Sequence, residues 1–477
     1  MRALPRTIRT AVVGSVASLA VIASAPAALA APGDWTQLST FSAATSKPEM
    51  TNTAELTMAR FADAAQIVWE GDTATGSSYF TAIVNGAGAI AAPSREVISN
   101  WQGLIKNPRL ISLSGQRFLV FSGLNPGYTG AAYYATSADG LTWGVGPGSL
   151  SAANSVYAGY GNDAVDNAGT PVWVGQSSSM GGILWHAGIS PSAPAPAGTD
   201  GHFALPCCGY DAATARDEAT GVVWAAFYSN ASGTTEKGVQ VGQILPTPGA
   251  FAAAPGSITT NDYGVNSLDP GQRLAMTSRA GGGVYVAFTL GYPSPTGIRI
   301  LELGTNRAMD IAASGRIGRI SLTSDPAGRL WLVYADSNRI KAVHTNPAAT
   351  QLGSIGSWGA PAGTETIWKS AALGSAGGVD IAASSDAGGK INAWYTQALR
   401  TLTVSASPGT VRRGHNVTIR VTDAGAPVAG VRVRFGSRSA TTNAAGKATF
   451  RPTSRGTVRV TAKKAGFNDG STGVRVR

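Results

Sequence analysis

The sequence predicts an all-β protein, a β-propeller of seven blades (six is the alternative) followed by a small β-sandwich. A segment of one type recurs roughly every fifty residues along most of the 477-residue chain. Gly (61 residues) and Pro (25 residues) are spread through the chain, which is typical of many turns between short strands. The pattern changes after residue 400, where the basic residues also concentrate. We therefore expect a propeller over residues 31–400 and a basic module over residues 401–477.

The first thirty residues have the parts of a secretory signal peptide. Three arginines come first, then an apolar run over 11–23, then the small-x-small site Ala28-Leu29-Ala30. No later stretch reaches the ~18 uninterrupted apolar residues that span a bilayer. We expect cleavage after residue 30 and a secreted protein, extracellular or attached to the cell surface, that does not span the membrane.

Seven short apolar segments divide the large region into similar units. Several follow a turn that opens with Asp and closes with Gly, and a second strand-like run follows each segment. Four strands in about fifty residues fit a propeller blade. A sandwich array or a solenoid is the alternative, but solenoid repeats are shorter and sandwich domains do not recur with this spelling. An N-terminal strand near 35–41 should close the ring by pairing with the last blade. The segments are QIVWEG (66), RFLVFS (117), PVWVGQ (171), VVWAAF (222), VYVAFT (284), RLWLVYA (329) and INAWYT (391).

The net charge of +11 is unevenly distributed. From Thr401 onward there are 14 Lys and Arg against two acidic residues, and the signal region contributes +3, which leaves residues 31–400 at −4. Because the large region has no basic patch with interleaved aromatic residues, the sequence argues against a nucleic-acid partner.

The stretch Ser137-Ala138-Asp139-Gly140-Leu141-Thr142-Trp143 resembles the Asp-box of the sialidase-like propellers, Ser-x-Asp-x-Gly-x-Thr-Trp. It has one residue fewer before the Gly, and the chain holds one good copy. Together with the repeat, the resemblance covers about residues 33–400 and implies the fold. In that family the Asp-box is a turn between the third and fourth strands, on the face away from the active site, so it implies no catalysis.

From Leu402 the chain alternates apolar and polar residues in short strands separated by turns. The stretches GAPVAGVRV (425–433) and TTNAAGKATF (441–450) resemble bacterial Ig-like and carboxypeptidase-regulatory-like modules, which implies a spacer or an adhesion module. Its arginines could hold the module on an anionic cell-wall polymer by screened attraction. A plain spacer with solvated arginines is the alternative. The arginines in question are Arg412, Arg413, Arg432, Arg434, Arg438, Arg451 and Arg459.

One residue per blade is expected at the top of the central funnel. It is found by counting back six residues from the turn that ends the innermost strand, except in the second blade, where the similarity of RLISL to RLAMT and RISLT indicates Arg109. Converging arginines would bind a carboxylate or sulfate by bidentate hydrogen bonds, whereas ordinary polar lining of a propeller channel is the alternative. The positions are Thr57, Arg109, Tyr160, Asp211, Arg273, Arg319 and Asp380.

The sialidase resemblance gives three of these residues a possible role. That family grips the sugar carboxylate with three arginines and works with a tyrosine, a glutamate and an aspartic acid. Arg109, Arg273 and Arg319 are similar to this trio in number and place, but the Arg-Ile-Pro signature of the first blade is absent. If the protein is a glycosidase, two groups must flank one bond. The catalytic candidates are Tyr160, Asp211, Glu70 and Asp336.

Metal binding has little support in the sequence. None of the four histidines pairs at ligand spacing, so we expect no zinc site and no cofactor. Asp163, Asp166 and Asn167 could help to hold calcium, but capping of a turn is the stronger interpretation.

The only two cysteines, Cys207 and Cys208, are adjacent and precede Asp211. Neighbouring Cα atoms are closer together (~3.8 Å) than those of a normal disulfide, so joining the two makes a strained ring. In an oxidising compartment this vicinal disulfide would form an apolar shelf for a ring-shaped ligand beside Tyr210. A loop staple, a reducible thiol pair and a link to a second chain are the alternatives.

Taken together, these features predict a protein that binds an anionic or carbohydrate ligand at the top of its funnel. An exo-acting glycoside hydrolase of sialidase type is the first alternative. A protein-binding scaffold is the second.

Overall fold

The computed structural model describes most of the chain from Gly33 to Arg477. The described residues are 33–42, 55–73, 76–101, 106–127, 130–150, 161–176, 182–189, 201–203, 209–229, 238–257, 274–290, 296–305, 307–313, 317–336, 338–387 and 390–477.

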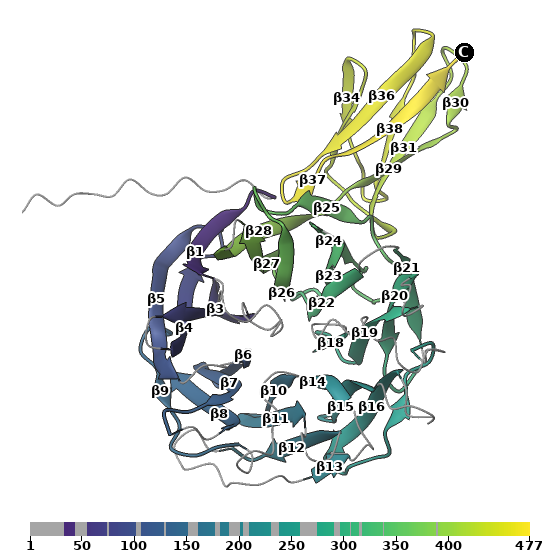
Figure 1. Ribbon diagram of the computed structural model, residues 1–477. Helices are drawn as coiled ribbons and strands as arrows, with labels where there is room; N and C mark the ends of the chain where they lie inside the picture. Colours follow the sequence, from purple (N-terminus) through teal and green to yellow (C-terminus); the bar gives the residue numbers. More distant parts are fainter. Residues whose placement is uncertain are drawn as a thin grey trace, which may run out of the picture.

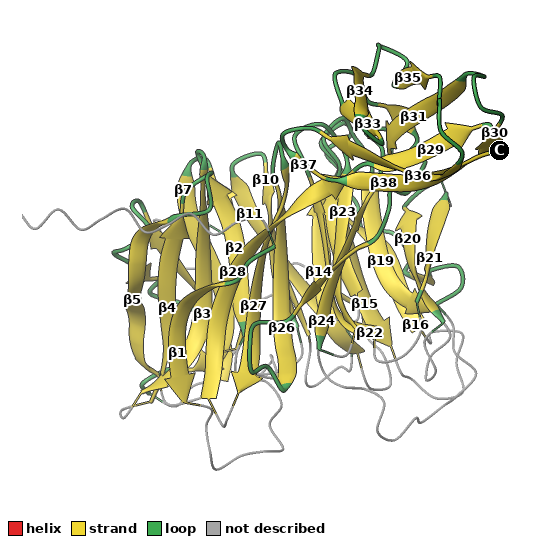
Figure 2. Ribbon diagram, turned by 90° about the horizontal axis from the view of Figure 1, so that it is seen from above, coloured by secondary structure: helices red, strands yellow, loops and turns green. Residues whose placement is uncertain are grey.

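The described part of the chain is built from β-strands and turns, without a helix (Figure 2). Seven antiparallel sheets stand side by side around a central axis in a propeller-like arrangement (Figure 1). In six of them the chain order of the strands is also their order from the axis outward. No described segment forms a helix that could cross a membrane.

The first three sheets take their strands from residues 56 to 203. Sheet one contains β2 (Leu56–Phe61), β3 (Ala64–Thr73), β4 (Gly76–Val84) and β5 (Ile90–Trp101). Sheet two contains β6 (Lys106–Leu113), β7 (Gln116–Leu124), β8 (Gly130–Ser137) and β9 (Gly144–Val145). Sheet three, which follows, contains β10 (Asn162–Asn167), β11 (Thr170–Gln176), β12 (Ile183–Ala187) and β13 (Gly201–Phe203).

The next three sheets continue the ring. Sheet four contains β14 (Gly209–Arg216), β15 (Val223–Ser229), β16 (Gly238–Leu245) and β17 (Ala252–Ala253). Sheet five contains β18 (Leu274–Ser278), β19 (Val284–Leu290), β20 (Gly297–Glu302) and β21 (Ala308–Ala312). Sheet six contains β22 (Ile317–Ser324), β23 (Leu330–Asp336), β24 (Arg339–His344) and β25 (Gly356–Gly359).

The seventh sheet joins the two ends of the large region. It consists of β26 (Thr366–Gly374), β27 (Gly378–Ala387), β28 (Lys390–Thr401) and, at its outer edge, β1 (Thr36–Ser42). β1 pairs antiparallel with β28, from Thr36 opposite Tyr395 to Ser42 opposite Lys390. The predicted closure of the ring by an N-terminal strand is thereby confirmed.

The sheets pack face to face through apolar side chains of their middle strands. Each pair of neighbouring sheets shares one cluster of buried residues, and a cluster of sheets one and seven completes the circle. Trp69, Trp173 and Trp331, all on second strands, are almost fully buried. Burial of such side chains at about 25 cal/mol per Å² is the main force that holds the sheets together. Six of the seven recurring apolar segments therefore recur because each supplies the second strand of a sheet, whereas the seventh, INAWYT, lies on β28, the third strand of its sheet.

The stretch 137–143 forms the connection between β8 and β9. The carboxylate of Asp139 accepts hydrogen bonds from the backbone amides of Leu141 and Thr142, each at 2.8 Å, and the indole of Trp143 donates to the carbonyl of Gly140. The bonds from Thr142 and Leu141 lower the pKa of Asp139 to about 2. The role of this segment is to hold a turn between the third and fourth strands.

Residues 402–477 form two further sheets that project from the rim near β24, β25 and β28 (Figure 1). The first sheet contains β29 (Thr403–Ser407), β31 (Val417–Asp423), β32 (Ala426–Pro427) and β35 (Lys447–Phe450). The second contains β30 (Thr410–Val411), β38 (Gly470–Val476), β36 (Gly456–Lys463), β33 (Arg432–Phe435) and β34 (Arg438–Thr441). A separate apolar cluster lies between the two sheets.

The junction between the two parts centres on Asp423, at the end of β31. Its side chain is 5% exposed, and its carboxylate lies 2.5 Å from Nε2 of His344 and 3.2 Å from Nη1 of Arg400. Nε of Arg329 is 3.9 Å away. Burial raises the pKa of Asp423, but His344, Arg400 and Arg329 lower it more, so the net pKa shift is downward. Beside this cluster, β37 (Phe467–Asn468) pairs in parallel with the end of β28.

Candidate functional site

The innermost strands of all seven sheets converge on one cavity of about 150 Å³ at the axis. The lining comes from the start or the middle of each strand, so segments more than three hundred residues apart in sequence meet there. The polar and charged lining residues are Glu55, Thr57, Asn107, Arg109, Asn162, Asp163, Asp211, Ser321, Lys369 and Ser370.

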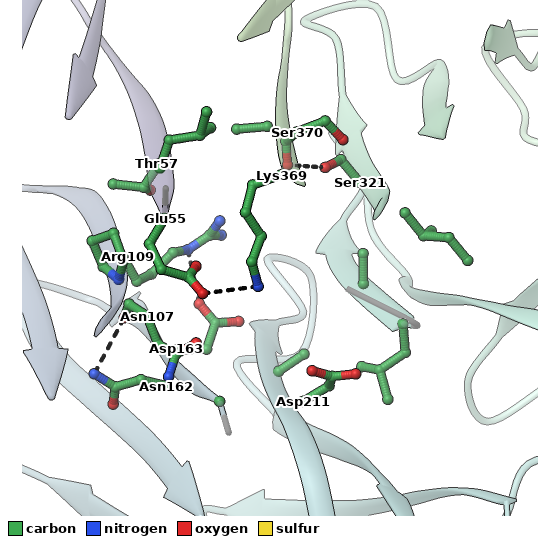
Figure 3. Close-up of a pocket in the computed structure, with 18 of the residues that line it drawn as sticks. Glu55, Thr57, Asn107, Arg109, Asn162, Asp163, Asp211, Ser321, Lys369 and Ser370 are labelled. Carbon is green, nitrogen blue, oxygen red and sulfur yellow. Dashed lines mark hydrogen bonds and ion pairs between the residues drawn. The ribbon is translucent and has the colours of Figure 1, made fainter. Parts of the chain in front are cut away.

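Two ion pairs occupy one side of this cavity (Figure 3). Oε1 of Glu55 lies 2.9 Å from Nζ of Lys369, and both side chains are less than 10% exposed. Nε of Arg109 lies 2.8 Å from Oδ1 of Asp163, while the Arg109 side chain remains 41% exposed. Asp211 lies apart from these four residues in Figure 3. Both cations of the described lining are therefore already matched by carboxylates.

Asp163 is held by two backbone amides besides its ion pair with Arg109, and its side chain is 11% exposed. Its Oδ2 accepts a hydrogen bond from the Thr214 amide, and its Oδ1 accepts one from the Ala164 amide, both at 2.8 Å. Burial raises the pKa of Asp163 by more than Arg109 and these two amides lower it. A carboxyl group with a raised pKa, facing a polar cavity, can hold a proton or accept a hydrogen bond from a ligand hydroxyl.

One backbone feature recurs at the mouth of the funnel. Asn107, Gly161, Asp211 and Arg319 have positive φ angles of 49°, 125°, 55° and 55°. In each of these sheets a turn joins the innermost strand to the second strand. The residue with the positive φ angle comes six residues before the last paired residue at the end of the innermost strand. These last paired residues are Leu113, Asn167, Asp217 and Asp325. Glu55 and Lys369 hold the same position in sheets one and seven, counted from Phe61 and Ser375.

The residue types at this position fit the conformation in three of four cases. Gly, Asn and Asp tolerate a left-handed backbone, whereas Arg does not. A Cβ atom on Gly161 would lie 2.4 Å from the backbone nitrogen of Ala212, so the close approach of β10 to β14 also requires glycine. Positive φ angles of this kind often occur at functional sites, and here Asn107, Gly161 and Asp211 line the cavity while Arg319 directly precedes the lining residue Ile320.

Arg319 is held by two contacts to β26. Its Nε donates to the carbonyl of Ile367, and its own carbonyl accepts a 2.7 Å hydrogen bond from Oγ of Ser370. The side chain is buried, and it is not among the lining residues. Of the three predicted arginines, Arg109 lines the cavity, Arg319 is turned toward the neighbouring sheet, and Arg273 lies outside the described residues.

Two other predicted residues are on the cavity wall. Asp211 occupies the recurring position, as the count from Asp217 predicts. Thr57 comes two residues after Glu55, which holds that position in sheet one. Its Oγ1 accepts a hydrogen bond from the Leu110 amide of the next sheet. Thr57 therefore links two innermost strands besides lining the cavity.

The structure places Asp380 elsewhere. The count assumed that the innermost strand of the last sheet runs to Asp386, but the innermost strand is β26, and Asp380 lies on the second strand, β27. There Asp380 forms an ion pair with Arg60, at the turn end of β2, and accepts hydrogen bonds from Tyr395 and Gln397. It links the first and last sheets instead of lining the cavity.

Two of the catalytic candidates are outside the cavity lining. Glu70 is buried on β3, where its backbone amide bonds the Glu55 carbonyl. Burial raises the pKa of the neighbouring Tyr79 well above its usual value, and Glu70 and Glu55 raise it further. Asp336, at the end of β23, forms an ion pair with Lys341.

Several predicted residues fall where the structure makes no statement. Tyr160, Arg273, Cys207 and Cys208 lie outside the described residues, and so does the side chain of Tyr210. The predicted vicinal disulfide and the shelf beside it therefore stay predictions.

The three residues suggested for calcium binding have separate partners. Asp163 pairs with Arg109, Asp166 accepts a hydrogen bond from the Gly169 amide of its own turn, and Asn167 accepts one from Arg216. In the part of the chain that the structure describes, no three His, Cys, Asp or Glu side chains group as a metal site would require.

Glu55 and Lys369 were not predicted as site residues, and Asp163 was considered only for calcium. A signal for Lys369 is present in the sequence, because the turn at Ser375-Ala376-Gly377-Gly378 has the spelling of the other turns, and counting back six from Ser375 gives Lys369. Glu55 follows in the same way when the count starts at Phe61, the last paired residue before the two-residue turn.

No protein-family model matches the chain, and no match is found among curated proteins. Similar solved structures include the GH93 α-L-arabinofuranosidase of Fusarium graminearum with arabinobiose, at 10% identity over 76% of this chain and 98% of that chain, with a TM-score of 0.43. A Hadza microbial sialidase matches at 12% identity over 73% of this chain and 65% of that one, with a TM-score of 0.40. The extracellular domain of a putative one-component system from B. thetaiotaomicron matches 93% of this chain at 12% identity and a TM-score of 0.39, and this chain covers 58% of its length. At these identities and TM-scores the similarities assign no activity.

Proposed function

We propose that the protein is a secreted, seven-bladed β-propeller of the sialidase-like type that binds a carbohydrate in its axial cavity. The observation that carries the proposal is the convergence of seven strand segments on one polar cavity. The Ig-like module that follows acts as a spacer or an adhesion module.

The charge of the described lining favours a hydroxyl-rich ligand over a simple anion. Two cations face three carboxylates, so the formal charge is one negative, and each cation is already within 3 Å of an acid. Carboxylates and the Asn107 and Asn162 amides offer the acceptors and donors that sugar hydroxyls need. The exposed guanidinium of Arg109 adds a donor for an acidic substituent on such a sugar.

The sharpest test replaces Asp211 with asparagine, because Asn tolerates the left-handed backbone and changes only the charge. A glycan array probed with the full chain should show a defined set of retained sugars. We expect D211N to weaken their binding by about ten- to a hundredfold, as the loss of a charged hydrogen-bond acceptor predicts.

Asp310→Asn serves as the matched control. Asp310 lies on the outermost strand β21, its side chain is 48% exposed, and it pairs with Arg299 of β20. Retention by D310N with loss in D211N supports the cavity as the site. Equal binding by both variants, or no retained sugar on the array, contradicts the proposal. Capture of a protein in place of a sugar would favour a scaffold.

A sialidase-type glycoside hydrolase is the second candidate, and the raised pKa of Asp163 favours it. Burial raises the pKa of Asp163, and a carboxyl group with a raised pKa is better suited than an ordinary one to protonate a leaving group, with Asp211 as the second acid. Release of a fluorescent aglycone from glycosides retained on the array should then be lost in D163N. Binding of the glycoside without release of its aglycone favours a protein that binds carbohydrate without cleaving it.

A further inference from the structure

The second sheet of the C-terminal part carries most of its positive charge on one face. On β33, Val433 and Phe435 point into the apolar cluster, while Arg432 and Arg434 are exposed. On β36 the exposed or half-exposed residues of the same face include Arg459, Thr461 and Lys463. Because side chains directly opposite in paired strands share a face, the register decides which residues gather.

The register brings these strands into one cationic surface. Arg432 lies opposite Lys463, Arg434 lies opposite Thr461, and Thr457 lies opposite Arg475 of β38. We call this the arginine face. Its cations are Arg432, Arg434, Arg459, Lys463, Arg475 and, at the chain end, Arg477.

The opposite face of the module is different. On the first sheet, Arg420 of β31 lies opposite Lys447 of β35 and Ser405 of β29, and threonine and serine fill the other outward positions. Two cations therefore stand at outward strand positions of the first sheet, and six belong to the arginine face. The module's other six cations lie in turns and loops or on the edge strand β34.

Little in the module neutralises the arginine face. Residues 401–477 are all described, and their only acids are Asp423 and Asp469. Asp423 is buried at the junction, and Asp469 forms an exposed ion pair with Lys463. An anionic partner bound on this face would offset the mutual repulsion of its unpaired cations, of which Arg432 and Arg434 are two residues apart on one strand.

The remaining side chains of the face select among polyanions. Thr457, Thr461 and Ser471 lie between the cations, and the outward positions of β33, β36 and β38 hold no aromatic ring. Single-stranded nucleic acids are bound on aromatic platforms, and peripheral membrane binding uses apolar side chains that insert between lipids. Guanidinium and hydroxyl groups on a flat sheet fit the oxyanions and hydroxyls of a polysaccharide.

We propose that the arginine face binds a linear anionic polysaccharide of the cell surface and so fixes the propeller beside its ligand. Neighbouring outward side chains are about 7 Å apart along a strand and about 5 Å apart between strands, which suits repeated carboxylate or phosphate groups along one polymer. The inference does not depend on the axial cavity, because the two surfaces belong to different sheets.

The test is affinity electrophoresis of the full chain in gels that contain polygalacturonate, with dextran as the uncharged polymer. R432Q/R434Q should lower the affinity for polygalacturonate by about tenfold relative to the unchanged protein. The slope of the logarithm of this affinity against the logarithm of the salt concentration should decrease by about two. The matched control is R420Q/K447Q, which removes the same charge from the opposite face and should bind as the unchanged protein does.

Three results would overturn the proposal. The two double variants could lose retardation equally, the unchanged protein could bind dextran as well as polygalacturonate, or it could prefer oligothymidylate or phosphatidylglycerol vesicles over polygalacturonate. Loss in R432Q/R434Q alone, with the same unfolding midpoint as the control variant, supports it.

Discussion

Lys369→Met is expected to lower the free energy of unfolding by about 3 kcal/mol, because it leaves the buried carboxylate of Glu55 without its cation. The two groups are 2.9 Å apart, with side chains 8% and 5% exposed, so water replaces the lost partner only in part. Methionine keeps the length of the side chain, so the effect is that of charge more than of packing. Urea unfolding of the full chain, followed by tryptophan fluorescence, measures the change.

The double variant Glu55→Gln/Lys369→Met separates a charge effect from a packing effect. Removing both partners of a buried ion pair together is often close to neutral, so most of the loss should return. If the double variant is as unstable as Lys369→Met alone, the side chain of Lys369 acts by filling space and the ion pair does not matter.

The all-β class and the repeat were accessible from the sequence because each sheet buries its second strand between two neighbours. That burial demands apolar β-branched and aromatic residues, and these make the recurring segments visible. The closing strand β1 could be predicted for a related reason, since a ring of sheets removes its own edges only by joining its two ends.

The site was only partly accessible because it depends on a count along each strand. Asp211 and Arg319 were placed correctly at the recurring position, since their turns open with Asp in the same register. Two-residue turns shift the count in the first three sheets, which is why Glu55 was missed. In the last sheet the turn that opens with Asp386 joins the second strand, β27, to the third strand, β28. Counting back from it therefore gave Asp380, whereas the residue at this position of the innermost strand is Lys369. A side chain's direction is a further step that no count supplies, as the turned guanidinium of Arg319 shows.

Asp423→Asn is expected to release the C-terminal part from the propeller rim, with a loss of about 3 kcal/mol in the free energy that holds the two together. The substitution removes the carboxylate that His344, Arg400 and Arg329 share across a largely buried junction. Arg329 keeps a second carboxylate, that of Asp325, at 3.5 Å. Small-angle scattering should show a larger radius of gyration, and limited proteolysis should cut near residue 401 faster. Asp469→Asn removes the module's other acid from an ion pair whose side chains are 67% and 51% exposed, and it should change neither measurement.

The same junction predicts a dependence on pH whose sign follows from the downward pKa shift of Asp423. A carboxyl group with a pKa below its unfolded value of about 3.9 contributes its full stabilisation above that value and loses it as the pH falls through the folded pKa. The difference in docking between the unchanged chain and Asp423→Asn should therefore shrink as the pH falls below about 4. A difference that stays the same down to pH 3 would mean that the carboxylate charge does not hold the junction, and that the paired backbones of β28 and β37 carry it instead.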